Sequence, residues 1–189
     1  MASKIFSKKN IVAVIISLIM ITSVIGFVSL NSLEKEYRYN GHTFTRDQDG
    51  YHIVVDKREL VFTYLPGDLS DVNISGNSAA ALKHTRLIMA SSQLDSASAQ
   101  GIAGSVYYLR NALAPYNIYV LSGFTNQGSR PAPVISCKNA TIYIPVIVFE
   151  DANTSEVITA GNCIRVQVAS PEYPSKFTQK VVYTVAGIV

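Results

Sequence analysis

Two cysteines are the residues of this chain best suited to covalent chemistry. Cys137 and Cys163 are the only cysteines among the 189 residues, and no Cys-x-x-Cys motif is present to lower the pKa of a thiol. If the domain is exported, an oxidising compartment favours a structural disulfide between them. Free thiols and a redox or metal-binding role are the alternatives.

The three histidines do not predict a metal centre. His42, His52 and His84 fall on separate predicted strands or turns, without the spacing or the companion cysteines of a zinc site. The chain also contains no phosphate-binding loop and no dinucleotide-binding glycine motif. We therefore predict no metal ligand, no cofactor and no cofactor-binding residue.

Catalytic groups are equally scarce. Ser105 follows a Gly-Ile-Ala-Gly run, but a nucleophile elbow needs Gly-x-Ser-x-Gly at a strand-to-helix turn. This serine lies inside a predicted helix, which the glycines allow to approach the sheet. Asp95, Glu150 and Asp151 are acids at predicted strand ends, where active sites of α/β proteins lie. They are the candidates for a hydrolase, although we assign no catalytic residue.

Three Asn-x-Ser/Thr triplets could accept N-linked glycans. They begin at Asn73, Asn139 and Asn153 and fall in predicted loops or at strand edges. Such triplets also arise by chance in a chain this rich in Asn, Ser and Thr. Glycosylation is therefore a hypothesis at these three positions.

An apolar segment near the N-terminus predicts a membrane anchor. Residues 11–30 contain no charge and no proline, and a helix of that length spans about the 30 Å of a bilayer core. Lys4, Lys8 and Lys9 precede it, so the positive-inside rule places the N-terminus in the cytoplasm. We predict a single-pass protein of the cell membrane, with a cytoplasmic tail over 1–10, a transmembrane anchor over 11–30 and an extracytoplasmic domain over 31–189. The alternatives are a cleaved signal peptide, although its apolar core is shorter, and a buried helix of a soluble protein.

Charge and length describe the rest of the chain as one folded domain. The net charge of +3 disappears without the three N-terminal lysines, because Lys plus Arg then equals Asp plus Glu at 13. A nucleic-acid-binding domain needs a basic face, so nucleic acid is not a predicted partner. About 150 residues are enough for one domain with its own core.

Alternating apolar residues between Tyr37 and Leu65 predict short antiparallel strands. Asn40-Gly41 and Asp49-Gly50 interrupt the pattern, and such pairs tolerate the positive φ of tight hairpin turns. We expect two or three strands here, followed by a polar connection over 69–78.

The central and C-terminal parts predict a sheet with two helices. A strand over 85–90, a helix with an apolar stripe from Ile102 to Leu113 and a strand over 116–121 form a βαβ unit. Further strands follow over 141–149, 157–160 and 163–169, and a terminal helix begins at Ser170-Pro171-Glu172. The predicted fold class is α+β: a transmembrane helix, then one mixed-sheet domain with two helices packed on one face.

Short motifs across residues 39–188 resemble single-pass archaeal envelope proteins of small-genome lineages. The matching segments are Tyr39-Asn-Gly-His-Thr-Phe44, Leu60 to Pro66, Asp71 to Ile74, Cys137-Lys-Asn-Ala-Thr141 with Pro145 to Ile147, Gly161-Asn-Cys-Ile164, and a terminal helix that ends at Tyr183 to Ile188. The resemblance implies an anchored exodomain with the two cysteines paired. It brings no assigned activity.

The function predicted from these features is a non-catalytic, membrane-anchored extracytoplasmic domain that binds or supports a component of the cell envelope. Its predicted partners are the lipid bilayer and an envelope protein or glycan. An envelope-associated hydrolase with an unidentified site is the first alternative. A pilin-like structural subunit is the second, although the processing Gly or Ala before the apolar segment and the acid near its start are missing.

Overall fold

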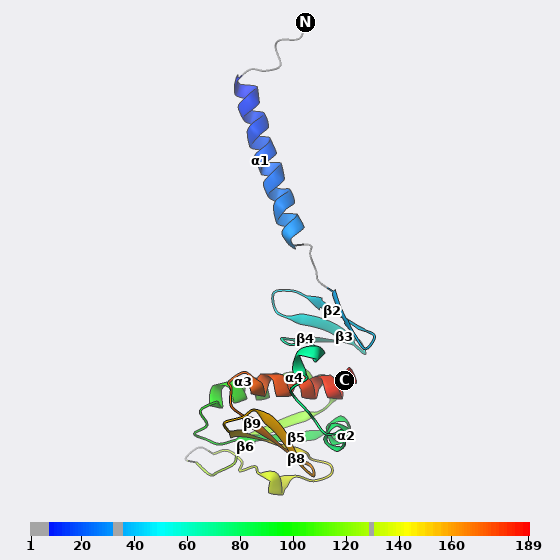
Figure 1. Ribbon diagram of the computed structural model, residues 1–189, viewed down its shortest axis with the longest axis vertical. Coiled ribbons are helices and arrows are strands. Elements are labelled where there is room, and N and C mark those ends of the chain that lie inside the picture. The colour runs from blue at the N-terminus through cyan, green and yellow to red at the C-terminus, as the bar shows by residue number, and fades with distance from the viewer. Residues whose placement is uncertain (1–7, 32–35, 129–130) are drawn as a thin grey trace.

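The computed structural model describes residues 8–31, 36–128 and 131–189 (Figure 1). Within these ranges the chain is α+β, with four α-helices and nine strands in two sheets. Sheet A has the strand order β1-β2-β3-β4, and sheet B has the order β6-β5-β7-β9-β8. The helices are α1 (Lys8–Asn31), α2 (Gly76–His84), α3 (Ala99–Leu113) and α4 (Tyr173–Val185). The strands are β1 (Glu36–Tyr39), β2 (His42–Arg46), β3 (Tyr51–Val55), β4 (Arg58–Phe62), β5 (Leu87–Ser92), β6 (Tyr119–Phe124), β7 (Val146–Asp151), β8 (Glu156–Ala160) and β9 (Cys163–Val168).

The prediction of one mixed sheet with two helices is wrong. The N-terminal strands form a separate antiparallel sheet A with four members, because tight turns return the chain at once. Asn40 and Gly41 join β1 to β2 with φ of 45° and 78°, and Asp56 and Lys57 join β3 to β4 with φ of 49° and 65°. The positive φ at both positions of each turn matches the twist of a hairpin.

The predicted polar connection over 69–78 also differs from the structure. A short 3-10 helix, η1 (Pro66–Leu69), ends at its first residue, and α2 begins within it at Gly76. The Ser75 hydroxyl accepts a hydrogen bond from the Ser78 backbone N–H at 3.4 Å, which satisfies one of the unpaired donors at the start of α2.

The predicted transmembrane anchor over 11–30 is contradicted. In the parts of the chain that the structure describes, no helix has both the length and the apolar character that a membrane crossing requires. The single-pass membrane localisation, with its cytoplasmic N-terminus and extracytoplasmic domain, depended on this anchor and is contradicted with it. Residues 1–7 of the predicted cytoplasmic tail lie outside the described residues.

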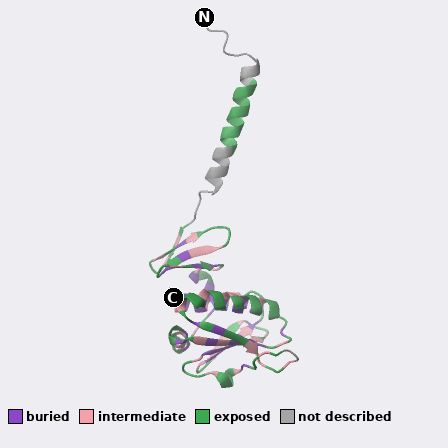
Figure 2. Ribbon diagram, turned by 180° about the vertical axis from the view of Figure 1, so that it is seen from behind, coloured by how far each residue is buried: buried purple, intermediate pink, exposed green. Residues whose placement is uncertain are grey.

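Helices α3 and α4 lie between the two sheets, and α4 packs against both of them (Figure 1). On the side of sheet A, the Tyr183 ring stacks on Phe62 with 3.8 Å between ring centroids. On the side of sheet B, Phe177 meets Phe149 edge to face at 5.9 Å. All four rings are fully buried, and Figure 2 shows buried residues in both sheets and in the layer between them. The main core is therefore continuous from sheet A through α4 to sheet B.

Polar side chains fasten sheet A to the helix layer. The Gln179 Oε1 atom accepts hydrogen bonds from the backbone N–H groups of Thr63 and Tyr64 at 2.8 and 3.0 Å. The Tyr183 hydroxyl donates to the Tyr64 carbonyl at 2.7 Å, and the Tyr108 hydroxyl of α3 donates to the Val61 carbonyl at 3.1 Å. Burial raises the pKa of both tyrosines, so both hydroxyls remain protonated donors.

Sheet B contains the predicted βαβ unit, which is confirmed. Strand β5 pairs in parallel with β6, and α3 connects them. Both strands begin two or three residues later than predicted. The one hydroxyl hydrogen of Thr85 is shared between the Leu87 and Tyr143 carbonyl oxygens, each 2.7 Å from Oγ1, which holds the turn before β5. A 3-10 turn, η2 (Ala114–Tyr116), and a left-handed Asn117 delay the start of β6.

Candidate functional site

The order in which strands are added to sheet B reverses at β5, although β5, β6 and β7 are parallel to one another. From β5 the chain passes through α3 to β6 on one side, and then crosses to β7 on the other side of β5. In open α/β sheets, ligands bind in the crevice outside the carboxyl ends of the strands at such a reversal. The ends of β5, β6 and β7 are therefore the first place to look for a site.

A cleft of about 770 Å³ opens at this end of the sheet, between α3 and the last residues of β5 and β6. Small-molecule sites commonly have volumes of roughly 300–1,000 Å³. The small side chains of Ala90, Ala99 and Ala103 leave the space open, and Ile102 and Val106 form an apolar wall. The cleft thus has the size and lining of a pocket for a small ligand.

Arg110 supplies the charge in this cleft. Its Nε donates to the Val120 carbonyl at 3.3 Å, and its Nη2 donates to the Ser122 hydroxyl at 3.0 Å. Among the described residues, it is the one charged side chain in the lining. A guanidinium has five N–H donors, so three remain for a ligand. Strand β6 therefore orients the guanidinium while leaving most of its donors available.

Two serines bring hydroxyls to the same side of the sheet. Side chains alternate along a strand, so Ser92 projects with Ala90 toward α3, and Ser122 projects with Val120. Ser92 is 9% exposed and lines the cleft. Ser91 pairs with Val148 and projects from the opposite face, where its hydroxyl is buried without a hydrogen-bond partner among the described residues.

Asp151, at the end of β7, fastens the loop that leads into α3. Its two carboxylate oxygens accept hydrogen bonds from the Ser96 hydroxyl and from the Ala97 backbone N–H, each at 2.8 Å. Burial tends to raise the pKa of this carboxyl, but the hydrogen bonds from Ser96, Ala97 and Ser98 together outweigh it, so the pKa is lowered. Asp151 is therefore an ionised structural group beside the cleft.

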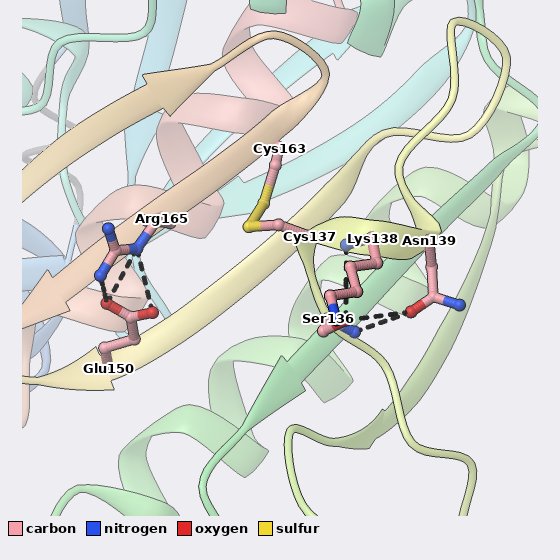
Figure 3. The surroundings of a disulfide bond; sticks show 7 residues. All are labelled: Ser136, Cys137, Lys138, Asn139, Glu150, Cys163 and Arg165. Carbon is pink, nitrogen blue, oxygen red and sulfur yellow. Dashed lines mark hydrogen bonds and ion pairs between the residues drawn. A yellow bond between two sulfur atoms is a disulfide. The ribbon is translucent and has the colours of Figure 1, made fainter.

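The three acids proposed for a hydrolase do not lie on one face of sheet B. Glu150 and Asp151 are consecutive in β7, so their side chains project from opposite faces of sheet B. Glu150 forms an ion pair with Arg165 of β9, with 2.6 Å between Oε2 and Nη2 (Figure 3). Asp95 is exposed in the loop before α3. Glu150 and Asp151 therefore do not form an acid and base pair, and Ser96, next to Asp95 in the chain, donates to Asp151.

Ser105 is occupied within α3. Its hydroxyl donates to the Gly101 carbonyl at 2.7 Å, and the residue is 5% exposed. A Cβ at Gly101 would lie 2.6 Å from the Pro171 carbonyl oxygen, whereas one at Gly104 would meet nothing within 4 Å. The prediction that both glycines serve an approach to the sheet is thus corrected: only Gly101 makes a close approach, to the segment before α4.

The disulfide between Cys137 and Cys163 is confirmed, with 5.3 Å between the two Cα atoms (Figure 3). Cys137 lies in a 3-10 helix, η3 (Cys137–Asn139), and Cys163 begins β9. Cys163 packs with Ile135, Val146 and Val148 in a small cluster on the face of sheet B opposite the helices. The bond therefore fixes the segment between β6 and β7 onto that face. No cysteine is free.

The histidines and the glycan acceptors lie away from the cleft. His52 of β3 lies 3.0 Å from Glu59 and 2.9 Å from Asp47, and the Glu59 hydrogen bond is the main cause of its raised pKa. In residues 8–31, 36–128 and 131–189, no group of three His, Cys, Asp or Glu side chains is arranged for a metal ion. The glycan acceptors are all exposed: Asn73, Asn139 and Asn153. Asn139 also accepts from the Ser136 backbone N–H at 2.9 Å (Figure 3).

The cleft residues Ser92, Arg110 and Ser122 were not predicted from the sequence. Polar residues at the ends of two consecutive parallel strands were the signal that could have found the serines. Arg110 gave no such signal, because a basic residue in the last turn of a helix is ordinary.

Comparison with known proteins adds no relative. No family model, no curated protein and no solved structure matches this chain. The resemblance to archaeal envelope proteins therefore stays a prediction.

Proposed function

We propose that this protein is a non-catalytic binding domain that holds a small molecule in the cleft between α3 and the ends of β5 and β6. The observation that carries the proposal is Arg110, which β6 orients at the rim of a 770 Å³ pocket. A side chain that is oriented before the ligand arrives loses little conformational entropy on binding. The binding role expected from the sequence is kept, without its membrane anchor.

The surroundings of the cleft support a rigid binding site. Asp151 holds the loop before α3 through two hydrogen bonds. The disulfide fixes the segment after β6, whose residues Pro133 to Ile135 bond to Phe124 at the end of β6. A Cβ at Gly123 would lie 2.3 Å from the Pro133 carbonyl oxygen, so this contact requires glycine. Both strand ends that form the cleft are therefore held in place.

The acids support a non-catalytic role. Asp151 accepts hydrogen bonds from Ser96 and Ala97 with both of its oxygens, so it holds the loop before α3. Glu150 is paired with Arg165 on the other face. A disulfide-stabilised binding domain also suits an oxidising environment, in which such a bond persists.

The test is an NMR titration of the full chain with benzyl alcohol, a small neutral probe. We expect the largest amide shifts at Ser92, Ser122 and Gly123. Ala103→Trp should abolish these shifts, because residue 103 lines the cleft and is exposed. Gly104→Trp is the matched control, since a side chain at this neighbouring helix position points into open space. Shifts that survive Ala103→Trp, or that lie elsewhere, would refute the cleft as the binding site.

A further inference from the structure

We propose that the ligand of this cleft carries one carboxylate, which binds Arg110, and an apolar or aromatic body, which lies along α3. This inference rests on the proposed function and names the ligand class for the same site. Three features of the cleft support it: the free donors of Arg110, the absence of a competing acid in the described lining, and the apolar wall.

The guanidinium of Arg110 has the geometry for a carboxylate. Its bonds to the Val120 carbonyl and the Ser122 hydroxyl hold it against β6 and leave three N–H donors. Arginine binds planar carboxylates through two parallel N–H···O bonds. The Ser122 oxygen accepts from Arg110, so its own hydrogen is available to donate to the same carboxylate. Ser122 would thus both orient the arginine and bind the anion.

The charge of Arg110 is not neutralised within the described part of the cleft. None of the described lining residues is acidic, and the hydrogen bonds of Arg110 go to the neutral Val120 carbonyl and Ser122 hydroxyl. A single cation balances a monoanion. A phosphate monoester carries about −1.5 to −2 at neutral pH. With Arg110 as the one cation among the described lining residues, about a third to a half of that charge would remain unpaired in a partly enclosed cleft, where unpaired charge is costly. The arrangement therefore favours a carboxylate over a phosphate.

The apolar wall sets the character of the rest of the ligand. Ile102 and Val106 are 3% and 8% exposed and lie one helical turn apart on α3. Leu94 and Phe124 also line the cleft. Apolar surface that such a wall removes from water contributes about 25 cal/mol per Å² to binding. An aromatic or aliphatic group next to the carboxylate would use this surface, and a small hydrophilic acid would not.

Three probes that share one ring test the inference by calorimetry on the full chain at neutral pH: phenylacetate, benzylphosphonate and benzyl alcohol. Phenylacetate should bind most tightly, and added salt should weaken it, because the charge contact is screened. Arg110→Gln should weaken phenylacetate by roughly tenfold or more and leave benzyl alcohol unchanged. Arg86→Gln is the control, because it removes the same charge from an exposed residue directly before the first residue of β5, whereas the cleft lies at the other end of that strand.

Each other outcome has a definite meaning. Unchanged phenylacetate binding in Arg110→Gln, no phenylacetate binding at all, or tighter binding of benzylphosphonate would each overturn the carboxylate inference. If benzyl alcohol still binds and Ala103→Trp blocks it, the proposed function stands while the ligand class falls. If Ala103→Trp blocks none of the probes, the proposed function itself fails. Unchanged benzyl alcohol binding in Arg110→Gln also shows that the cleft keeps its fold in the variant.

Discussion

Removal of the Cys137–Cys163 disulfide should lower the free energy of unfolding by about 3.5 kcal/mol. The two residues are 26 positions apart. For a loop of this length the chain-entropy relation gives a loss of about 12 cal/mol/K in the unfolded state, or about 3.5 kcal/mol at 25 °C. The effect arises because the bond limits the conformations of the unfolded chain, so the folded contacts need not change.

Alanine is the right replacement at both positions. Cys163 is 2% exposed and packs in the cluster with Ile135, Val146 and Val148, whereas Cys137 is exposed. Alanine therefore removes the bond without burying a polar group. Cys163→Ser would add an unpaired hydroxyl in that cluster, which lowers the free energy of unfolding by roughly a further 1–3 kcal/mol. A comparison of the two replacements separates the bond from the packing.

The assay is urea unfolding of the native protein, of the Cys137→Ala/Cys163→Ala variant, and of both with a reductant. Reduction of the native protein and the double substitution should lower the free energy of unfolding by similar amounts. In both cases this free energy should fall more steeply with urea concentration, because the unfolded chain without the bond expands and exposes more surface. The midpoint of thermal unfolding should fall by about 7–14 °C. The reductant should not affect the variant. A loss below about 1 kcal/mol would refute the entropic reasoning.

Two further predictions concern sheet A. Gln179→Met should lower the free energy of unfolding by about 2–4 kcal/mol, because the N–H groups of Thr63 and Tyr64 lose their buried acceptor. Gln179→Glu keeps an acceptor, so its free energy of unfolding should fall by less. Equal losses for the two variants in urea unfolding would contradict this prediction. The Glu59 hydrogen bond raises the pKa of His52, so its stabilisation is fully present below the unfolded pKa of about 6.5 and is lost as the pH rises through the folded pKa. The difference in the free energy of unfolding between the native protein and His52→Gln should therefore shrink from about pH 6 to about pH 9. It should stay below about 1 kcal/mol because the Glu59 carboxylate is exposed. A difference that grows with pH would contradict a raised pKa of His52 in the folded protein.

Much of the local structure could be predicted because it depends on neighbours in the sequence. Asn40-Gly41 specifies a hairpin turn wherever it occurs between strands, since both residues tolerate positive φ. The apolar stripe of α3 and the strands on either side specify a βαβ unit by their period alone. With two cysteines, the disulfide had one possible pairing within the chain.

The assignment of strands to sheets could not be predicted in the same way. Whether β4 joins β5 or ends a separate sheet depends on hydrogen bonds between distant segments, and alternation along a strand says nothing about its partner. The same limit applies to α4. The sequence predicted a terminal helix packed on one face of a sheet, but sheet A covers its other side and buries Gln179 and Tyr183 as well.

The sequence by itself determined the kinds of elements, the available covalent bond and the absence of recognised catalytic motifs, because these are properties of residue type and short spacing. Only the tertiary structure decided where a ligand could bind. Arg110 is an ordinary basic residue near the end of a helix until β6 presents the Val120 carbonyl and the Ser122 hydroxyl to its guanidinium. A site of this kind depends on the distance between a helix and a strand edge, and the packing of the whole domain sets that distance.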